Sequence, residues 1–136
     1  MEFTFIGLTC CWLVLCAIQD WRGHEVSNVL TLPVLGASLL WRLMGWGRGS
    51  FFSLFCITIL LLLVWRKGWI GGADLKASLA IALFDLCLFG WAWIGVLLWY
   101  LISRFILQKG DMHRMTGFPG FAVGAFLFLI WRVSGG

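Results

Sequence analysis

The sequence has 136 residues, of which 62% are hydrophobic and 12% are charged, and its formal net charge is +4. A soluble domain usually has about 45–50% apolar and about 25% charged residues. This composition therefore argues against a soluble enzyme, a nucleic-acid-binding domain and a disordered chain. It indicates an integral membrane protein, and six spanning helices of about 20 residues would use nearly the whole chain.

Six apolar runs predict six membrane-spanning helices. In chain order they cover residues 3–19, 28–44, 51–65, 75–89, 91–107 and 118–133. Pro33 removes one helix hydrogen bond, and because a helix that starts there is too short to span, we expect a kink. Little more than Gly90 separates the fourth run from the fifth, so these two runs alternatively form one long, broken segment. The expected fold is all-α, a polytopic membrane protein with a single transmembrane domain over residues 1–136.

The first apolar run is predicted to be a retained helix. Glu2 stands where a signal peptide has a basic cluster, and no small-residue cleavage site follows the run. The five cysteines also lie in apolar runs without a C-x-x-C pair, so we expect buried small side chains and neither a zinc site nor a disulfide framework.

Lysine and arginine residues predict the orientation in the membrane. One side of the six-span topology carries seven of them: Arg22, Arg66, Lys67, Lys76, Arg104, Lys109 and Arg114. The other side carries three: Arg42, Arg48 and Arg132. The richer side should be cytoplasmic by the positive-inside rule, and both termini then face outward across the plasma (inner) membrane. Tryptophans near the ends of the runs are typical of an interfacial aromatic belt.

Two aspartates stand out because acids near a bilayer are expensive. Asp20 lies at the end of the first predicted helix, and Asp74 lies at the start of the fourth. Two spans separate them, so both carboxylates are predicted at the same cytoplasmic boundary. Two carboxylates in close contact do not both ionise easily, so one keeps its proton while the other acts as a base. Such a pair can activate water and protonate a leaving amine without a metal ion.

The residues around Asp74 are small, in the order Gly71-Gly72-Ala73-Asp74-Leu75-Lys76. Small residues let a backbone or a substrate strand approach closely. The alternative interpretation is a loop followed by an aspartate that caps the start of a helix, which is a common arrangement.

Together, the two aspartate motifs resemble the type IV prepilin peptidases and archaeal preflagellin peptidases, which are membrane aspartyl proteases of the G-x-G-D type. The family's first motif reads approximately D-x-R-x-x-x-I-P-N. Residues 20–28 match it at Asp20, Arg22 and Asn28, with Val26 as a conservative replacement and Ser27 in place of the proline.

The second family motif, G-x-G-D-x-K, is matched by Gly71, Asp74 and Lys76, while Ala73 replaces the second glycine. Residues 118–124 also resemble the proline- and glycine-containing final helix of the family. The resemblance covers most of the chain, from Asp20 to about Gly124.

The resemblance implies an aspartyl endopeptidase that cleaves the N-terminal leader peptide of a prepilin or pseudopilin at the cytoplasmic membrane face. The implied catalytic residues are Asp20 and Asp74. The implied substrate-binding or motif-supporting residues are Arg22, Asn28, Gly71, Gly72 and Lys76. No metal or other cofactor is expected. The expected partners are the leader peptide and membrane lipid, not nucleic acid, and the oligomeric state stays open.

The family's bifunctional members carry an N-terminal cytoplasmic region with paired cysteines that supports N-methylation. This sequence contains no such region, so the resemblance is to the short, peptidase-only members, and no methyltransferase activity is expected.

Two other functions stay open from the sequence. A small transporter or assembly subunit would use acids inside the membrane, and Asp85 fits that hypothesis best. The other open function is that of an inactive homologue, because Ala73 departs from the motif.

His24, Asp111 and His113 lack the spacing of metal ligands, so a metal site there is disfavoured. His24 and Glu25 are expected in a solvated interfacial loop rather than in contact with a substrate leader.

Overall fold

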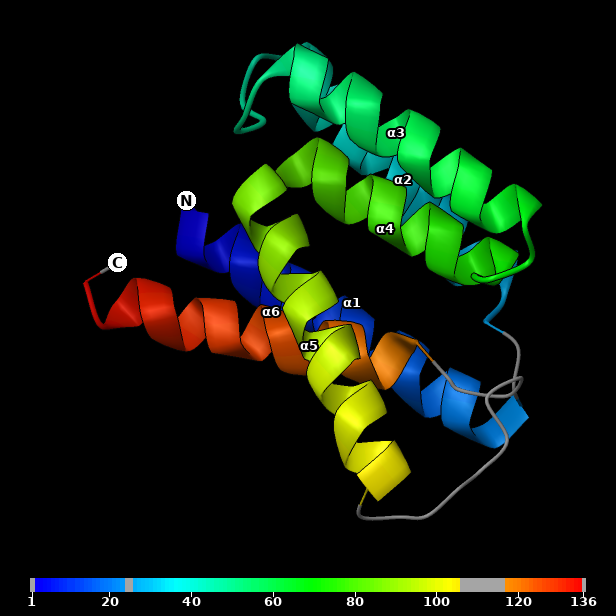
Figure 1. Ribbon diagram of the computed structural model, residues 1–136. Helices are drawn as coiled ribbons and strands as arrows, with labels where there is room; N and C mark the ends of the chain where they lie inside the picture. Colours follow the sequence, from blue (N-terminus) through cyan, green and yellow to red (C-terminus); the bar gives the residue numbers. More distant parts are fainter. Residues whose placement is uncertain (1, 24–25, 106–116, 136) are drawn as a thin grey trace. The chain divides into compact units, whose positions relative to one another are not determined.

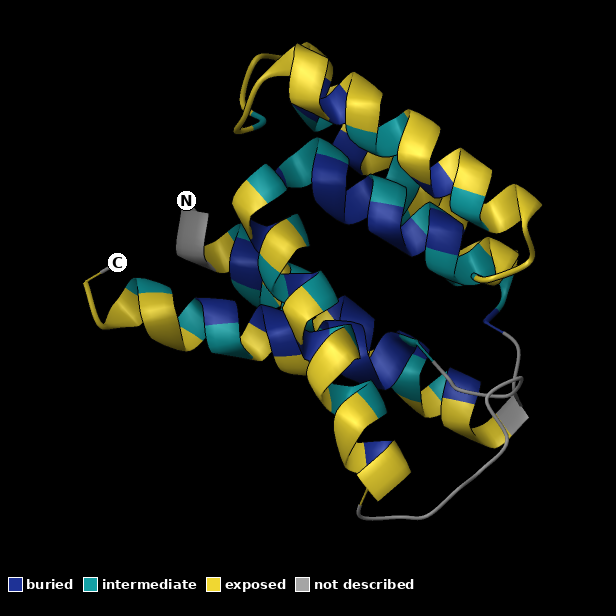
Figure 2. Ribbon diagram, in the orientation of Figure 1, coloured by how far each residue is buried: buried dark blue, intermediate teal, exposed yellow. Residues whose placement is uncertain are grey.

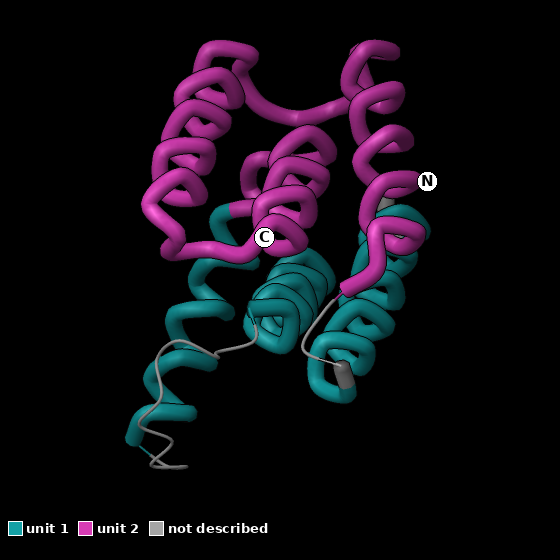
Figure 3. Tube along the Cα trace, turned by 90° about the vertical axis from the view of Figure 1, so that its right-hand side faces the viewer, with its two compact units in different colours: residues 1–25, 90–136 teal, residues 26–89 magenta. Residues whose placement is uncertain are grey.

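The computed structural model describes residues 2–23, 26–105 and 117–135, and within them it contains six helices and no strand. The helices are α1 (Glu2–Gly23), α2 (Asn28–Leu43), α3 (Phe51–Arg66), α4 (Gly72–Phe84), α5 (Leu86–Phe105) and α6 (Phe118–Val133) (Figure 1). The prediction of an all-α fold is confirmed. The chain forms two compact units, one of residues 1–25 and 90–136 and the other of residues 26–89 (Figure 3).

Helix α4 is the centre of the 26–89 unit, because both α2 and α3 pack against it. It runs in the same direction as α2 and opposite to α3 (Figure 1). Its buried residues are mostly small, including Ala77, Ser78, Ala80 and Ala82. Small side chains let helices approach closely, and dispersion between well-packed helices stabilises them in an apolar medium. Figure 2 shows α4 largely buried and α3 largely exposed.

The break between α4 and α5 falls at Asp85, so the expected boundary at Gly90 is wrong. Asp85 has an extended backbone (φ −154°, ψ 121°), and its Oδ1 accepts hydrogen bonds from the backbone N–H groups of Cys87 (2.7 Å) and Leu88 (3.1 Å). This is the bonding pattern of a helix N-cap. Gly90 lies inside α5. The fourth helix also begins earlier than expected, at Gly72 rather than at residue 75.

The loop that joins α2 to α3 holds this break in place. The backbone N–H of Arg48 donates to the carbonyl of Phe84, and the N–H of Leu86 donates to the carbonyl of Arg48, each at 3.4 Å. Beneath the loop, the buried Arg42 side chain donates from Nη2 to the carbonyl oxygen of Gly49 at 2.5 Å. Gly49 has φ +103°, a conformation that side chains rarely adopt.

The other unit contains α1, α6 and most of α5. Helices α1 and α6 pack side by side in opposite directions (Figure 1). Helix α5 crosses α6 at three glycines, Gly95, Gly120 and Gly124. A Cβ at Gly124 would lie 2.6 Å from the Cα of Ala92, and one at Gly120 would lie 2.5 Å from the Cα of Val96. The spacing of Gly120 and Gly124 is that of a G-x-x-x-G helix contact.

Within the described residues, two helices are long and apolar enough to cross a bilayer, α1 over Thr4–Arg22 and α5 over Leu86–Phe105. Helices α2, α3 and α6 are apolar but have 16 residues each, or about 24 Å of helix. Pro33 lies inside α2, so the helix does not start at the proline. These lengths and compositions are consistent with a membrane protein.

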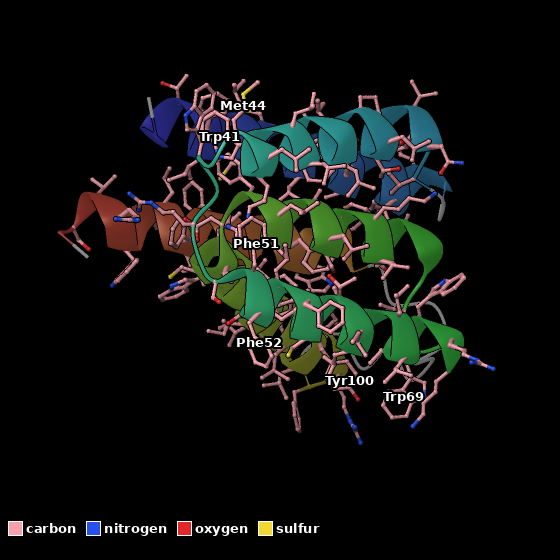
Figure 4. All side chains as sticks on the ribbon, turned by 90° about the horizontal axis from the view of Figure 1, so that it is seen from above. Trp41, Met44, Phe51, Phe52, Trp69 and Tyr100 are labelled. Carbon is pink, nitrogen blue, oxygen red and sulfur yellow. The ribbon has the colours of Figure 1, made fainter. Side chains whose placement is uncertain are left out.

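Aromatic side chains mark both ends of α3 (Figure 4). Phe51 and Phe52 lie at its start, and Trp69 follows its end, where the Lys67 ammonium lies 5.2 Å from the Trp69 ring centroid. At the end of α2, the rings of Trp41 and Trp46 are 4.8 Å apart. Aromatic and basic side chains at helix ends are typical of the membrane–water interface.

Candidate active site

Asp74 lies in the first turn of α4, after the N-cap residue Gly71. The positive end of the helix dipole favours a negative charge at this position. A Cβ at Gly71 would lie 3.3 Å from Oδ2 of Asp74, so the carboxylate is folded back toward the start of the helix. The Asp74 side chain is half-buried, whereas Gly71 and Gly72 are exposed.

The two glycines differ in the room around them. At Gly71, the Asp74 carboxylate lies next to the position that a Cβ would take. At Gly72, the nearest atom is Nε1 of Trp65, at 3.9 Å from the position of a Cβ, which is an ordinary van der Waals distance. A Cβ would therefore make an ordinary contact at Gly72 and a tight contact with the acid at Gly71.

Lys76 and Asn28 connect the two motifs within the 26–89 unit. The Nζ of Lys76 donates a hydrogen bond to Oδ1 of Asn28 at 2.5 Å. Asn28 is the first residue of α2, and Lys76 lies in the second turn of α4. The end of the first motif and the end of the second motif therefore lie side by side.

Ser27, which replaces the motif proline, is the N-cap residue of α2. Its backbone has φ −66° and ψ 144°, and its side chain makes no capping hydrogen bond. A proline fixes φ at about −65°, so the serine takes the backbone conformation that a proline would require. The backbone at this departure from the family motif is therefore one that the motif proline could also adopt.

Asp20 lies in the last turn of α1, in the other compact unit, and its side chain is 8% exposed. It follows the buried residues Leu13 and Cys16 at helical spacing, which places it on the packed face of α1. The adjacent Arg22 side chain is exposed. Asp20 and Asp74 belong to different units, so their predicted pairing stays a prediction.

One polar residue near the site was not singled out from the sequence. Ser78 is fully buried one turn after Asp74, and among the described residues its Oγ has no hydrogen-bond partner. Its position four residues after Asp74, on the same face of a helix, is the sequence pattern that could have identified it. Across residues 2–23, 26–105 and 117–135, no group of three or more His, Cys, Asp or Glu side chains is arranged to hold a metal ion. His24, Glu25, Asp111 and His113 lie outside the described residues.

The family model described as the type IV leader peptidase family matches residues 7–135. The chain belongs to the type IV leader peptidase family. The resemblance to prepilin peptidases is thus confirmed, and membership implies a protease. Comparison with curated proteins and with solved structures gave no match. The bond between Asn28 and Lys76 joins the last residue of the first motif to the last residue of the second motif.

Proposed function

We propose that this chain is a membrane-embedded aspartyl endopeptidase that removes the N-terminal leader from prepilin-like proteins. Asp20 and Asp74 are its catalytic residues, and the two compact units form a single transmembrane peptidase domain over residues 1–136. The observation that supports the proposal is the hydrogen bond between Lys76 and Asn28, because it links the last residue of the first motif to the helix end that carries Asp74.

The helix ends suggest which aspartate is the base. Asp74 lies at the N-terminal end of α4, where the helix dipole stabilises a carboxylate. Asp20 lies in the last turn of α1, where the dipole favours a neutral group. We therefore assign the general base to Asp74 and the general acid to Asp20.

In the first step, Asp74 takes a proton from water as the water oxygen bonds to the carbonyl carbon of the scissile peptide. Asp20 gives its proton to the carbonyl oxygen. The C–N bond then breaks as the amine takes the proton held by Asp74, and Asp20 recovers a proton from the hydroxyl group of the intermediate. The products are the leader, with a new carboxyl terminus, and the pilin, with a new amine.

The other motif residues have supporting roles in this proposal. Gly72 leaves room for the backbone of the leader to approach Asp74. Lys76 and Asn28 hold the start of α4 against the start of α2. Two further motif residues are proposed to support the site. Arg22 is exposed two residues after Asp20, and Gly71 lies next to the Asp74 carboxylate. No cofactor takes part, and no methyltransferase activity is proposed.

The proposed topology has six spans, with the active site at the cytoplasmic face of the plasma (inner) membrane. It is supported by the six apolar runs and by the seven basic residues on one side. The exposed apolar side chains of α3 and the aromatic rings at its ends also support a lipid environment.

The transporter alternative is weakened, because Asp85, the acid that fitted it best, caps α5 through its Oδ1.

A direct test of the peptidase proposal is co-expression of the chain with a panel of tagged type IV prepilins, tight-adherence prepilins, pseudopilins and pre-archaellins. Loss of the leader from one class, seen by gel shift and mass spectrometry, supports the proposal and identifies the substrate. Intact leaders throughout, with the protein inserted in the membrane, favour an inactive homologue.

A further inference from the structure

An open groove of about 350 Å³ lies between α1 and α6 within one compact unit. It is lined by Val14, Ala17, Ile18, Trp21 and Arg22 of α1 and by Pro119 and Ala122 of α6. Among the described residues that line the groove, Arg22 is the charged one and all the others are apolar. The volume falls at the lower end of the range of about 300–1,000 Å³ that ligand sites occupy.

The groove is separate from the proposed catalytic carboxylate. Val14, Ile18 and Trp21 recur at the spacing of one helix face, and this face is exposed. Asp20 does not line the groove, because it lies about 100° away around the helix from Trp21 and on the packed side. A ligand of the groove is therefore not the peptide bond that is cleaved.

The groove covers a defined length of α1. From Val14 to Arg22 the helix rises by about 12 Å, close to the roughly 15 Å of one leaflet's hydrocarbon core. Arg22 ends the apolar segment Thr4–Arg22. The Trp21 side chain is 66% exposed, and its ring centroid lies 6.5 Å from that of Trp99. Tryptophan and arginine at such a position are typical of the headgroup level.

We propose that this groove binds an anionic phospholipid, with an acyl chain along the apolar lining and the phosphate at Arg22. A guanidinium group binds phosphate through two parallel hydrogen bonds, and the apolar lining matches a hydrocarbon chain. With the proposed orientation, Arg22 lies at the cytoplasmic leaflet, where anionic lipids are enriched. The lipid is bound whether or not the peptidase is active, so the test needs no activity readout.

The test uses the full chain in phosphatidylcholine vesicles that contain spin-labelled phosphatidylglycerol or spin-labelled phosphatidylcholine. Electron paramagnetic resonance measures the motionally restricted fraction of each label, and their ratio gives the preference for the anionic lipid. We expect the wild-type chain to prefer phosphatidylglycerol several-fold. Arg22→Gln should lower the preference toward one, whereas Arg66→Gln, which also removes one exposed basic residue, should leave most of it.

A second pair of variants tests the groove itself. Ala122→Phe fills the groove and should abolish the preference, whereas Val123→Phe, at an exposed neighbouring position outside the groove, should not. Ala17→Leu fills the groove from α1 and replaces Ala122→Phe if that variant does not fold. The proposal is overturned if the wild type shows no preference. It is also overturned if the preference survives in Arg22→Gln or in a correctly folded groove-filling variant.

Discussion

Lys76 donates a hydrogen bond from Nζ to Oδ1 of Asn28, a residue 48 positions earlier in the chain. Each residue ends one of the two aspartate motifs. The bond therefore sets the start of α2 beside the start of α4, two residues from Asp74. The helix end that carries Asp74 is thus joined to the start of the neighbouring helix α2.

Removal of this bond should affect cleavage more than stability. The bond is exposed, so we expect Lys76→Met and Asn28→Ala each to lower the unfolding free energy by less than about 1 kcal/mol. Cleavage should fall clearly in both, and the double variant should be no worse than the poorer single variant, because both changes remove the same interaction. Lys67→Met, at a lysine outside this bond, is the control. Additive losses in the double variant would contradict a shared role.

Gly71→Ala should reduce cleavage, because the new Cβ would lie 3.3 Å from Oδ2 of Asp74 and push the carboxylate aside by a few tenths of an ångström. Gly36→Ala is the control, since a Cβ at this position, in α2 of the same unit, would meet no atom within 4 Å. Cleavage rates of both variants, compared at equal amounts of inserted protein, check this. Equal activities of the two variants would show that the close contact at Gly71 is unimportant.

Gly124→Ala should destabilise the crossing of α5 and α6. The added methyl group would lie 2.6 Å from the Cα of Ala92, so a backbone has to move, and overpacking of this kind costs about 1–3 kcal/mol. Gly90→Ala, in α5 with no atom within 4 Å of the new Cβ, should be neutral or slightly stabilising. Thermal unfolding of the purified protein measures both, and a neutral Gly124→Ala would rule out the tight crossing.

Asp85→Ala should lower stability by about 1 kcal/mol, because it removes the side chain that caps α5. Asp85→Asn should be close to the wild type, since asparagine caps a helix equally well. Proton flux in liposomes provides the second readout. A flux that is present in the wild type and lost in Asp85→Asn would restore the transporter hypothesis.

The composition and the apolar runs were sufficient to predict an all-helical chain, and most helix ends fall within a few residues of the predicted ones. The break at Asp85 was missed because the run around it is almost continuously apolar, and a cap depends on one side chain bonding to two backbone groups. The motif aspartates were found by spacing and resemblance. The bond between Asn28 and Lys76 was not predictable, because it depends on how α2 packs against α4.

The groove between α1 and α6 illustrates the same limit of sequence patterns. Its α1 lining recurs at helical spacing, which an apolar run already suggests, but the second wall comes from Pro119 and Ala122, about 100 positions later in the chain. Close approach at Gly120 and Gly124 likewise depends on the packing partner in α5. Tertiary neighbours, rather than local propensity, determine these features.

The most direct test of the central claim is cleavage of a tagged prepilin by the purified full chain in vesicles, followed by mass spectrometry of both products. We expect one cut between the leader and the apolar segment by the wild type and by Asp85→Asn. Asp20→Asn and Asp74→Asn should each slow the cut by roughly 10²–10⁴-fold while remaining folded and inserted. Wild-type cleavage by either of these two variants would contradict the two-aspartate mechanism.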